Sequence, residues 1–430
     1  MKFFIVTLGC KVNQYESQAI FERLTNFGFC KADSEENADI IIINSCTVTA
    51  ESDKKVRKVV HKARRSNKNA IIILTGCMAQ AFKEDCEKLE EVDIILGNSQ
   101  KSEILEKINE FLIKRRKLVE VENFSNKINY DDFRVNKFYD RTRAFVKIED
   151  GCNRFCTYCI IPYARGRVRS KPIEKLYEEI KNLADNGYKE VVLVGINLFS
   201  YGQDIDSNLC DVIEKISTID LLKRIRLGSL EPECMSSDVI IRLSKQKKLC
   251  PQFHLSLQSG CNETLKRMNR HYTAEEYKEI VDNLRKYFKN ASITTDIMVG
   301  FAGETEAEFN ESLNFVKYIK FSKIHVFPYS IREGTKAALF KNQVLPDIKS
   351  KRVAIMAKAA EDSKCDFLNS QVDIVSSVLF EREIEPNIFE GYTENYTPVK
   401  LKSDKNISGM ILDVKIKSVE NNYCLAELVN

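Results

Sequence analysis

The sequence has no tryptophan, no apolar run of membrane-spanning length and a net charge of only +4. Its longest apolar runs, such as Ile40–Ile43 and Ile71–Leu74, have the length of strands, whereas a transmembrane helix needs about 20 residues. The apolar stretch Phe3–Leu8 is too short for a signal peptide and lacks a small-residue cleavage site. We therefore expect a cytoplasmic protein without a membrane partner.

Cysteine, in contrast, is abundant, with 14 residues in a chain of 430. A disulfide framework is typical of small secreted proteins, and neither the length nor the N-terminus fits that class. In a reducing compartment, grouped cysteines more often bind metal or take part in redox chemistry. The grouping of the cysteines is therefore the main question that the sequence raises.

Two regions alternate apolar strand patterns with helical periodicity, which predicts parallel sheets and an α/β fold. The first has the flavodoxin-like pattern of a doubly wound sheet. The second has six strand–helix units, which suit a partial (β/α)6 barrel. Four short strand patterns after residue 366 predict a small C-terminal β-barrel. We expect domains at 1–113, 141–365 and 366–430, with a linker at 114–140.

The segment Gly151–Cys159 carries the most specific motif, a C-x3-C-x2-C run formed by Cys152, Cys156 and Cys159. Three thiolates on one loop can bind three irons of a cubane cluster and leave the fourth iron open to a ligand. The loop follows the strand pattern Ala144–Ile148, so it belongs at the face of the barrel where active sites lie. The alternatives are a zinc knuckle or three unrelated thiols. Zinc requires a fourth Cys or His nearby, and the next histidine is His254.

The motif, with the aromatic Tyr158 before its last cysteine, resembles the radical S-adenosylmethionine superfamily. The wider stretches Arg143–Cys152, Cys159–Gly166, Gly228–Pro232, His254–Gly260 and Met268–Thr273 are similar to the methylthiotransferase family within it. This resemblance covers nearly the whole chain. It implies that S-adenosylmethionine chelates the open iron, that one electron cleaves it to a 5′-deoxyadenosyl radical, and that the backbone at Tyr158 holds the adenine.

A second set of cysteines is spread along the first region: Cys10, Cys46 and Cys77 each follow the end of a predicted strand. The carboxyl ends of parallel strands share one edge of a sheet, so these residues can converge there. Three ordinary half-buried thiols remain the alternative from topology alone. The segments Leu8–Ser17, Asn44–Val48 and Gly76–Gln80 resemble the signatures of the family's N-terminal domain. The resemblance implies a second [4Fe-4S] cluster that carries sulfur, and we read the other eight cysteines as structural.

Polar residues and glycines at the strand ends of the second region are candidates for the cofactor site. Glycine allows close approach of a ligand to the backbone, and short polar side chains suit ribose and amino-acid groups. These candidates are Gly195, Asn197, Ser229, Glu231 and Gln258.

Basic residues in two regions are candidates for phosphate contacts. Arg165, Arg167 and Arg169 follow the cysteine loop, and the pairs Lys400/Lys402 and Lys415/Lys417 alternate along strands of the last domain. That domain resembles the RNA-binding TRAM fold, although its eleven acidic residues outnumber its six basic ones. The expected partner is tRNA, at its anticodon stem-loop.

The resemblance implies methylthiolation of an adenine at carbon 2 of the ring, with two [4Fe-4S] clusters, S-adenosylmethionine and a low-potential donor such as flavodoxin or ferredoxin. The segment Gly9–Gln14 is most similar to the branch that acts on N6-threonylcarbamoyladenosine at position 37 of tRNA. The alternatives are the same chemistry on isopentenyladenosine or on a ribosomal-protein aspartate, and a non-catalytic RNA-binding iron–sulfur protein.

Overall fold

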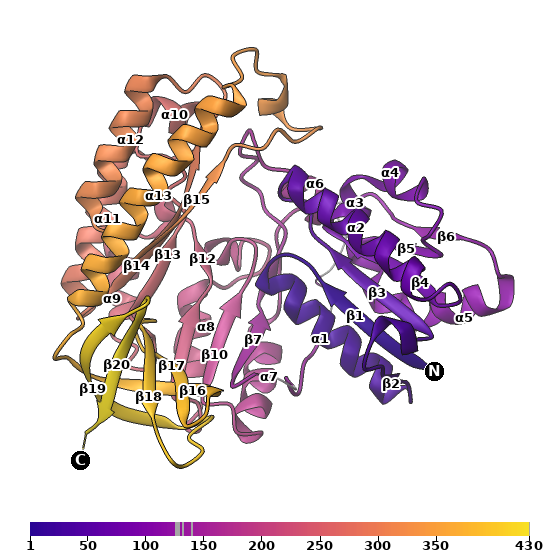
Figure 1. Cartoon of the computed structure of the whole chain (residues 1–430), viewed down its shortest axis with the longest axis horizontal. Helices are drawn as coiled ribbons and strands as arrows, with labels where there is room; N and C mark the ends of the chain where they lie inside the picture. The colour runs from indigo at the N-terminus through magenta and orange to yellow at the C-terminus, as the bar shows by residue number, and fades with distance from the viewer. Residues whose placement is uncertain (125–129, 131–132, 139–140, 430) are drawn as a thin grey trace.

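The computed structural model describes every residue except 125–129, 131–132, 139–140 and 430. An N-terminal sheet with its helices, a larger half-barrel and a small closed barrel lie side by side (Figure 1). Among the described residues, no helix combines the length and the apolar character that a membrane crossing requires. The predicted α/β class with parallel sheets and a C-terminal β-barrel is confirmed.

The N-terminal sheet has the strand order β2-β1-β3-β4-β5-β6 and is parallel throughout. Isoleucine-rich β3 and β4 are buried on both faces, as parallel strands covered by helices must be. The strands are β1 (Lys2–Thr7), β2 (Cys30–Lys31), β3 (Ile40–Ser45), β4 (Ile71–Gly76), β5 (Ile94–Leu96) and β6 (Leu118–Glu120). The helices are α1 (Lys11–Asn26), α2 (Ala50–Ser66), α3 (Cys77–Ala81), α4 (Lys83–Glu87) and α5 (Ile104–Lys114). The order reverses between β1 and β3, and such a switch point opens a crevice beyond the strand ends.

The half-barrel contains two parallel sheets, β11-β10-β7 and β12-β13-β14-β15. Its long strands are β7 (Arg143–Lys147), β10 (Glu190–Val194), β11 (Arg224–Leu227), β13 (Gln252–Leu255), β14 (Ser292–Val299) and β15 (Lys323–Pro328). Short β12 (Ser229–Leu230) continues β11 past Gly228 and transfers the chain to the second sheet. A Cβ at Gly228 would lie 3.0 Å from the Leu193 carbonyl oxygen, so the crossing leaves little room for a side chain.

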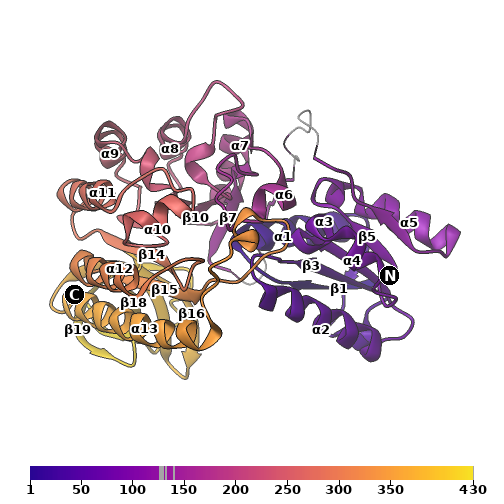
Figure 2. The same ribbon diagram turned by 90° about the horizontal axis from the view of Figure 1, so that it is seen from above.

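Helices cover the outer side of these strands (Figure 1). They are α7 (Ile173–Asp185), α8 (Leu209–Ser217), α9 (Ser237–Ser244), α10 (Asn262–Arg267), α11 (Ala274–Tyr287), α12 (Glu306–Ile319) and α13 (Pro346–Asn369). The short helix α6 (Ile161–Arg165) instead packs against α3 of the N-terminal part. Seen from above, the chain after β15 reaches across to the N-terminal part (Figure 2). Arg332 of this crossing donates to the Thr47 hydroxyl and the Asp53 carboxylate, both at 2.7 Å. The half-barrel and the N-terminal sheet are therefore joined beside the loop of Cys46.

Five strands close the C-terminal barrel in the order β16-β17-β18-β20-β19. They are β16 (Val375–Glu385), β17 (Ile388–Thr393), β18 (Pro398–Lys402), β19 (Ile411–Glu420) and β20 (Tyr423–Leu428). The sequence patterns did not predict β17. This barrel packs against the lower ends of β10 and β11, where Arg224 donates to the Ser377 carbonyl at 2.7 Å.

The stretch predicted as a linker, 114–140, contains β6, which pairs with β5 and extends the N-terminal sheet. Its later residues Phe133, Val135 and Phe138 are buried in the hydrophobic core of the half-barrel. The remaining part of the stretch includes 125–129, 131–132 and 139–140, which lie outside the described residues. The domain limits themselves stay a prediction.

Candidate functional site

The loop of Cys152, Cys156 and Cys159 begins directly after β7 and β8 (Glu149–Asp150) and ends at α6. Gly151 enters it with φ +86°, and a Cβ there would lie 2.0 Å from the Arg167 carbonyl oxygen. Backbone hydrogen bonds hold the loop, from Cys152 to Gly166 at 3.0 Å and from Thr157 to Met268 at 3.0 Å. These bonds hold the loop against the residues that directly follow α6 and α10.

The three thiols of this loop are half-buried and lie close enough to influence one another. Burial, together with the neighbouring Cys156 and Cys152, raises the pKa of Cys159 to about 12. Neutral thiols of this kind become thiolates only when a metal stabilises them. The Arg270 guanidinium lies 3.4 Å from the Cys156 sulfur and would offset part of the negative charge of a bound cluster.

Cys10, Cys46 and Cys77 follow β1, β3 and β4, so the first two flank the switch point of the N-terminal sheet. A Cβ at Gly9 would lie 2.7 Å from the Cys46 Cβ, so the two loops touch only because position 9 is glycine. The Asn13 amide ties these loops together, donating to the Leu8 carbonyl at 2.7 Å and to the Ser45 carbonyl at 2.9 Å. Topology thus brings together residues that are far apart in the sequence.

The thiols of Cys77 and Cys10 lie close enough to Cys46 to influence its pKa. Burial raises the pKa of Cys46 to about 11, and Cys77 and Cys10 contribute further. Among the described residues, no three Cys, His, Asp or Glu side chains lie close enough to hold a single metal ion. A cubane cluster spaces its ligands more widely, because each thiolate binds a different iron. The cysteines of both sets are free, and their thiols are the ligands that such a cluster takes.

The remaining eight cysteines are also free thiols. One of them, Cys234, contacts the loop of Cys152, because its sulfur accepts a hydrogen bond from Arg154 of that loop at 3.2 Å. Cys261, next to Gly260, is buried. Their assignment as structural residues stays a prediction.

A cavity of about 160 Å³ lies beside Cys159 and Tyr158. Gln258 and Asp296 of the half-barrel line it, and Val48 of the Cys46 loop closes it from the N-terminal side. Gln258 Oε1 is buried and has no hydrogen-bond partner among the described residues. An orphaned acceptor beside the cysteine loop is what a polar cofactor would satisfy.

The other candidate cofactor residues lie at neighbouring strand ends. Both amide atoms of Asn197 are buried without a partner among the described residues. Gly195 leaves space for Glu149, whose Oε2 would lie 2.6 Å from a Cβ at position 195. Ser229 is exposed in a second, larger cavity. Glu231 is not open to a ligand in the same way, because it forms an ion pair with Arg270 at 2.5 Å.

Two residues at this site were not assigned a role from the sequence. Glu149 is buried, and its Oε2 accepts backbone hydrogen bonds from Ile196 at 2.8 Å and Asn197 at 3.0 Å. Burial raises the pKa of Glu149 well above its usual range. Arg270 joins Glu231 to Cys156. Both residues stand in the stretches that carry the family resemblance, which is the signal that could have identified them.

The larger cavity, about 700 Å³, runs along the inner side of the half-barrel. Cys10 and Lys11 close it from the N-terminal side, and Gly195 and Ser229 line its upper end. Asp296 lines both this cavity and the one beside Cys159. The two cavities therefore share Asp296 in their walls, and each is lined by one cysteine, Cys10 in the larger cavity and Cys159 in the smaller one.

The structure corrects the prediction that Arg165 contacts RNA. Its side chain is fully buried at the junction and donates to Glu16 at 2.8 Å, Asp150 at 2.9 Å and Asn13 at 2.6 Å. Lys101 and Lys147 complete this buried ionic cluster around Glu16. Arg165 is committed to the junction because charges without water need partners.

The other RNA candidates lie nearer the surface. Arg167 is exposed and covers the Phe155 ring at 4.5 Å, whereas Arg169 is partly buried and donates to two carbonyl groups. Lys400, Lys415 and Lys417 form ion pairs with acidic neighbours of the small barrel. Lys402 is exposed, and no ion pair involving it is found among the described residues. Their contact with RNA stays a prediction.

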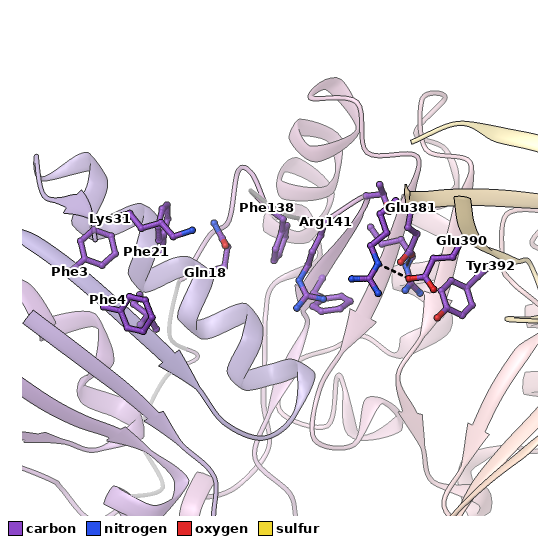
Figure 3. Close-up of a pocket in the computed structure, with 15 residues that line it drawn as sticks. Phe3, Phe4, Gln18, Phe21, Lys31, Phe138, Arg141, Glu381, Glu390 and Tyr392 are labelled. Atoms are coloured by element: carbon purple, nitrogen blue, oxygen red, sulfur yellow. Dashed lines mark hydrogen bonds and ion pairs between the residues drawn. The ribbon is translucent and has the colours of Figure 1, made fainter. Parts of the chain in front are cut away.

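A further cavity of about 520 Å³ lies between β1, β7 and the small barrel. Phe3, Phe4 and Phe21 face it from the N-terminal sheet, and Tyr392 lies on the opposite side (Figure 3). Arg382 is bound to Glu390 at 2.7 Å. Arg143 is likewise paired with Glu381. Two of the cations that line this cavity, Arg382 and Arg143, are thus paired with carboxylates of the protein itself.

Comparison with known proteins places these observations in a wider setting. Residues 146–316 match the Radical SAM superfamily, and residues 2–97 match the uncharacterized protein family UPF0004. A solved structure of the radical S-adenosylmethionine methyltransferase TsrM from Kitasatospora setae, with cobalamin and a [4Fe-4S] cluster bound, has a TM-score of 0.57 at 13% identity. That match covers 76% of this chain and 74% of the other, and it supports the fold.

Curated relatives extend over nearly the whole chain. The threonylcarbamoyladenosine tRNA methylthiotransferase MtaB of Bacillus subtilis is 40% identical over 95% of this chain and 92% of its own length. The enzyme of the same name from Aquifex aeolicus is 37% identical, with 96% and 99% covered. A tRNA-2-methylthio-N(6)-dimethylallyladenosine synthase of Clostridium botulinum is also 37% identical, with 96% and 94% covered.

Proposed function

Because the chain belongs to the radical S-adenosylmethionine methylthiotransferase family, we propose that it converts N6-threonylcarbamoyladenosine at position 37 of tRNA to its 2-methylthio derivative. The observation that carries this proposal is the space of two adjoining cavities, one lined by Cys10 and the other by Cys159, with Asp296 in the walls of both. A substrate base in that space would be within reach of both sets of cysteines at once.

The chain uses S-adenosylmethionine and [4Fe-4S] clusters, as its family does. We assign one cluster to Cys152, Cys156 and Cys159, and the sulfur-carrying cluster to Cys10, Cys46 and Cys77. With its cofactor bound, the first cluster supplies one-electron cleavage of the sulfonium, which activates the C–H bond of the base. A low-potential protein such as flavodoxin or ferredoxin would deliver the electron.

Other residues of the chain would position the cofactor and the loop of Cys156. Gln258 and Asn197 offer buried amide groups to the cofactor, and Glu149 holds the backbone at Ile196 and Asn197 in place. Arg270 fixes Glu231 against the loop of Cys156.

The test is mass analysis of tRNA nucleosides after reaction with the anaerobically reconstituted protein. The expected product is the 2-methylthio form of N6-threonylcarbamoyladenosine. Methylthiolated isopentenyladenosine would instead assign the chain to the other tRNA branch. A deletion strain with unchanged tRNA and a lighter ribosomal protein would indicate a protein substrate, and absence of 5′-deoxyadenosine under reducing conditions would indicate a non-catalytic role.

A further inference from the structure

The inner surface of the half-barrel is polar, unlike the apolar interior that fills a complete (β/α)8 barrel. Alternate residues of three adjacent strands face the larger cavity: Gln252 and His254 of β13, Thr294 and Asp296 of β14, and Lys323 and His325 of β15. Side chains at i and i+2 of a strand share a face, so this polar face is built into the sequence. A hydrated polar interior of this volume is suited to a ligand rather than to a packed core.

Two cations in the cavity have no partner within the described part of the chain. The ammonium of Lys11, the first residue of α1, takes part in no ion pair or hydrogen bond there, and neither does that of Lys323. Both side chains have solvent-exposed surface. Burial and the nearby Arg143 and Arg226 lower the pKa of Lys11 to about 8, so its ammonium form still predominates at pH 7. Their charges act on the same residue: burial lowers the pKa of His325, and Lys323 and Lys11 lower it further. The two ammonium groups therefore face one region of the cavity.

The other charged groups of the cavity are already bound. Arg226 donates to Glu190 at 2.8 Å and to the Thr393 carbonyl at 3.2 Å. Asp296 contacts His254 Nε2 at 3.3 Å. The two lysines thus outnumber the single acidic side chain Asp296, and the cavity retains positive charge. An anion entering it would find two unused donors.

We propose that Lys11 and Lys323 bind the carboxylate of the threonyl group carried by the target adenosine. This inference rests on the proposed function, since N6-threonylcarbamoyladenosine ends in a carboxylate and isopentenyladenosine ends in a neutral hydrocarbon. Lys11 directly follows Cys10, so the carboxylate would be held next to the set of cysteines assigned to sulfur delivery. The charge would also exclude the apolar substrate, because unpaired ammonium groups would then lose water without compensation.

An RNA phosphate is the other source of the same chemistry. The cavity lies along the inner side of the half-barrel next to Cys10, and under the proposed function the nucleoside that reacts has to enter it. Backbone phosphates of a loop stay outside when a single base is extruded into a pocket. We therefore assign the donors to the carboxylate and use the phosphate as an outcome of the test.

The experiment measures Kd for anticodon stem-loop RNAs with the reconstituted enzyme and no reductant. The RNAs carry N6-threonylcarbamoyladenosine, its neutral methyl ester or plain adenosine. Wild type should bind the acid about tenfold or more tightly than the ester, as expected for a charge-assisted hydrogen bond. Lys11→Gln and Lys323→Gln should each reduce this ratio, and Lys11→Arg should preserve it. Lys286→Gln, which removes an exposed lysine of α11, should leave it unchanged.

Three outcomes would overturn the inference. The first is an unchanged acid-to-ester affinity ratio in both glutamine variants, and the second is a wild type that does not distinguish acid from ester. The third is an equal loss of affinity for acid and ester in the variants, which would identify a phosphate contact. The iron content of Lys11→Gln checks that the neighbouring cluster is intact, and Lys323→Gln repeats the test away from Cys10. If wild type converts the threonylcarbamoyl substrate while the ratio is unaffected by either variant, only this inference fails. If it converts isopentenyladenosine instead, the proposed function fails.

Discussion

The two sets of cysteines reach the same junction by different routes. Cys152, Cys156 and Cys159 lie on one loop, and that loop is held by its own backbone hydrogen bonds. Cys10, Cys46 and Cys77 come from three strand ends and meet only when the N-terminal sheet has formed. A local motif can be recognised in the sequence alone, whereas residues at separate strand ends come together only in the folded sheet. The comparison predicts that the two sets respond differently to mutation.

The largest effect is expected in the loop. Replacement of Cys152, Cys156 or Cys159 by alanine should each abolish 5′-deoxyadenosine formation, because every thiolate binds one iron and no spare cysteine lies in the loop. The measurement is nucleoside yield under reducing conditions. Cys365→Ser, at an exposed cysteine outside both sets, is the control. Normal yield from a loop variant would contradict the cluster assignment.

Alanine at Cys10, Cys46 and Cys77 together should separate the two activities. Because these residues belong to the N-terminal sheet, the half-barrel should keep its cluster, with about half of the iron and with retained cofactor cleavage. Methylthiolated product should be absent. Iron, 5′-deoxyadenosine and modified nucleoside are measured on one reconstituted sample. Product at the wild-type rate would mean that the sulfur has another origin.

The junction between the sets depends on Glu16. Glu16→Gln should destabilise the protein by about 3–5 kcal/mol, because Arg165, Lys101 and Lys147 would be left buried without their shared partner. Thermal or denaturant unfolding measures this loss. Glu106→Gln, which breaks an exposed pair with Arg23, should cost about 1 kcal/mol or less. Equal effects of the two changes would show that the buried cluster contributes no more than a surface pair.

The same residue predicts a pH dependence. Burial favours the neutral form of Glu16, but Arg165, Lys101 and Lys147 outweigh it and hold the pKa well below the usual range. A depressed pKa in the folded state gives stability that is present above the unfolded value and is lost as pH falls below about 4.3. Wild type should therefore lose stability in acid more steeply than Glu16→Gln. Parallel pH profiles would contradict this role.

The smallest effects are expected at the surface, where the two regions can be compared as RNA contacts. Affinity for tRNA should fall steeply with salt, and Arg167→Ala should lower the salt slope by about one phosphate contact. Lys402→Ala should do the same on the small barrel if that barrel contacts RNA. Binding titrations at several salt concentrations give both slopes. Affinity independent of salt would exclude a backbone contact.

The sequence predicted the local features well and the convergent ones less well. The loop of Cys152 and the alternation of strands and helices were predicted because each depends on neighbouring residues. Strands β6 and β17 were missed: β6 has only three residues, and β17 includes Gly391 and the acidic Glu390. Arg165 was misassigned because a basic run in the sequence does not reveal which members turn inward. Its partners, Glu16 and Asn13, come from a distant segment that no local pattern connects to it.

The buried ionic cluster also has a consequence for the order in which the chain is made. Glu16 and Lys101 are synthesised well before Lys147 and Arg165, so the sheet can be complete while half of its ionic partners do not yet exist. Until then, the edge that carries Cys10 and Cys46 keeps its charges hydrated and open. Docking of the half-barrel replaces that water with fixed counter-charges. The buried cluster at the junction can thus be completed only after Arg165 has been synthesised.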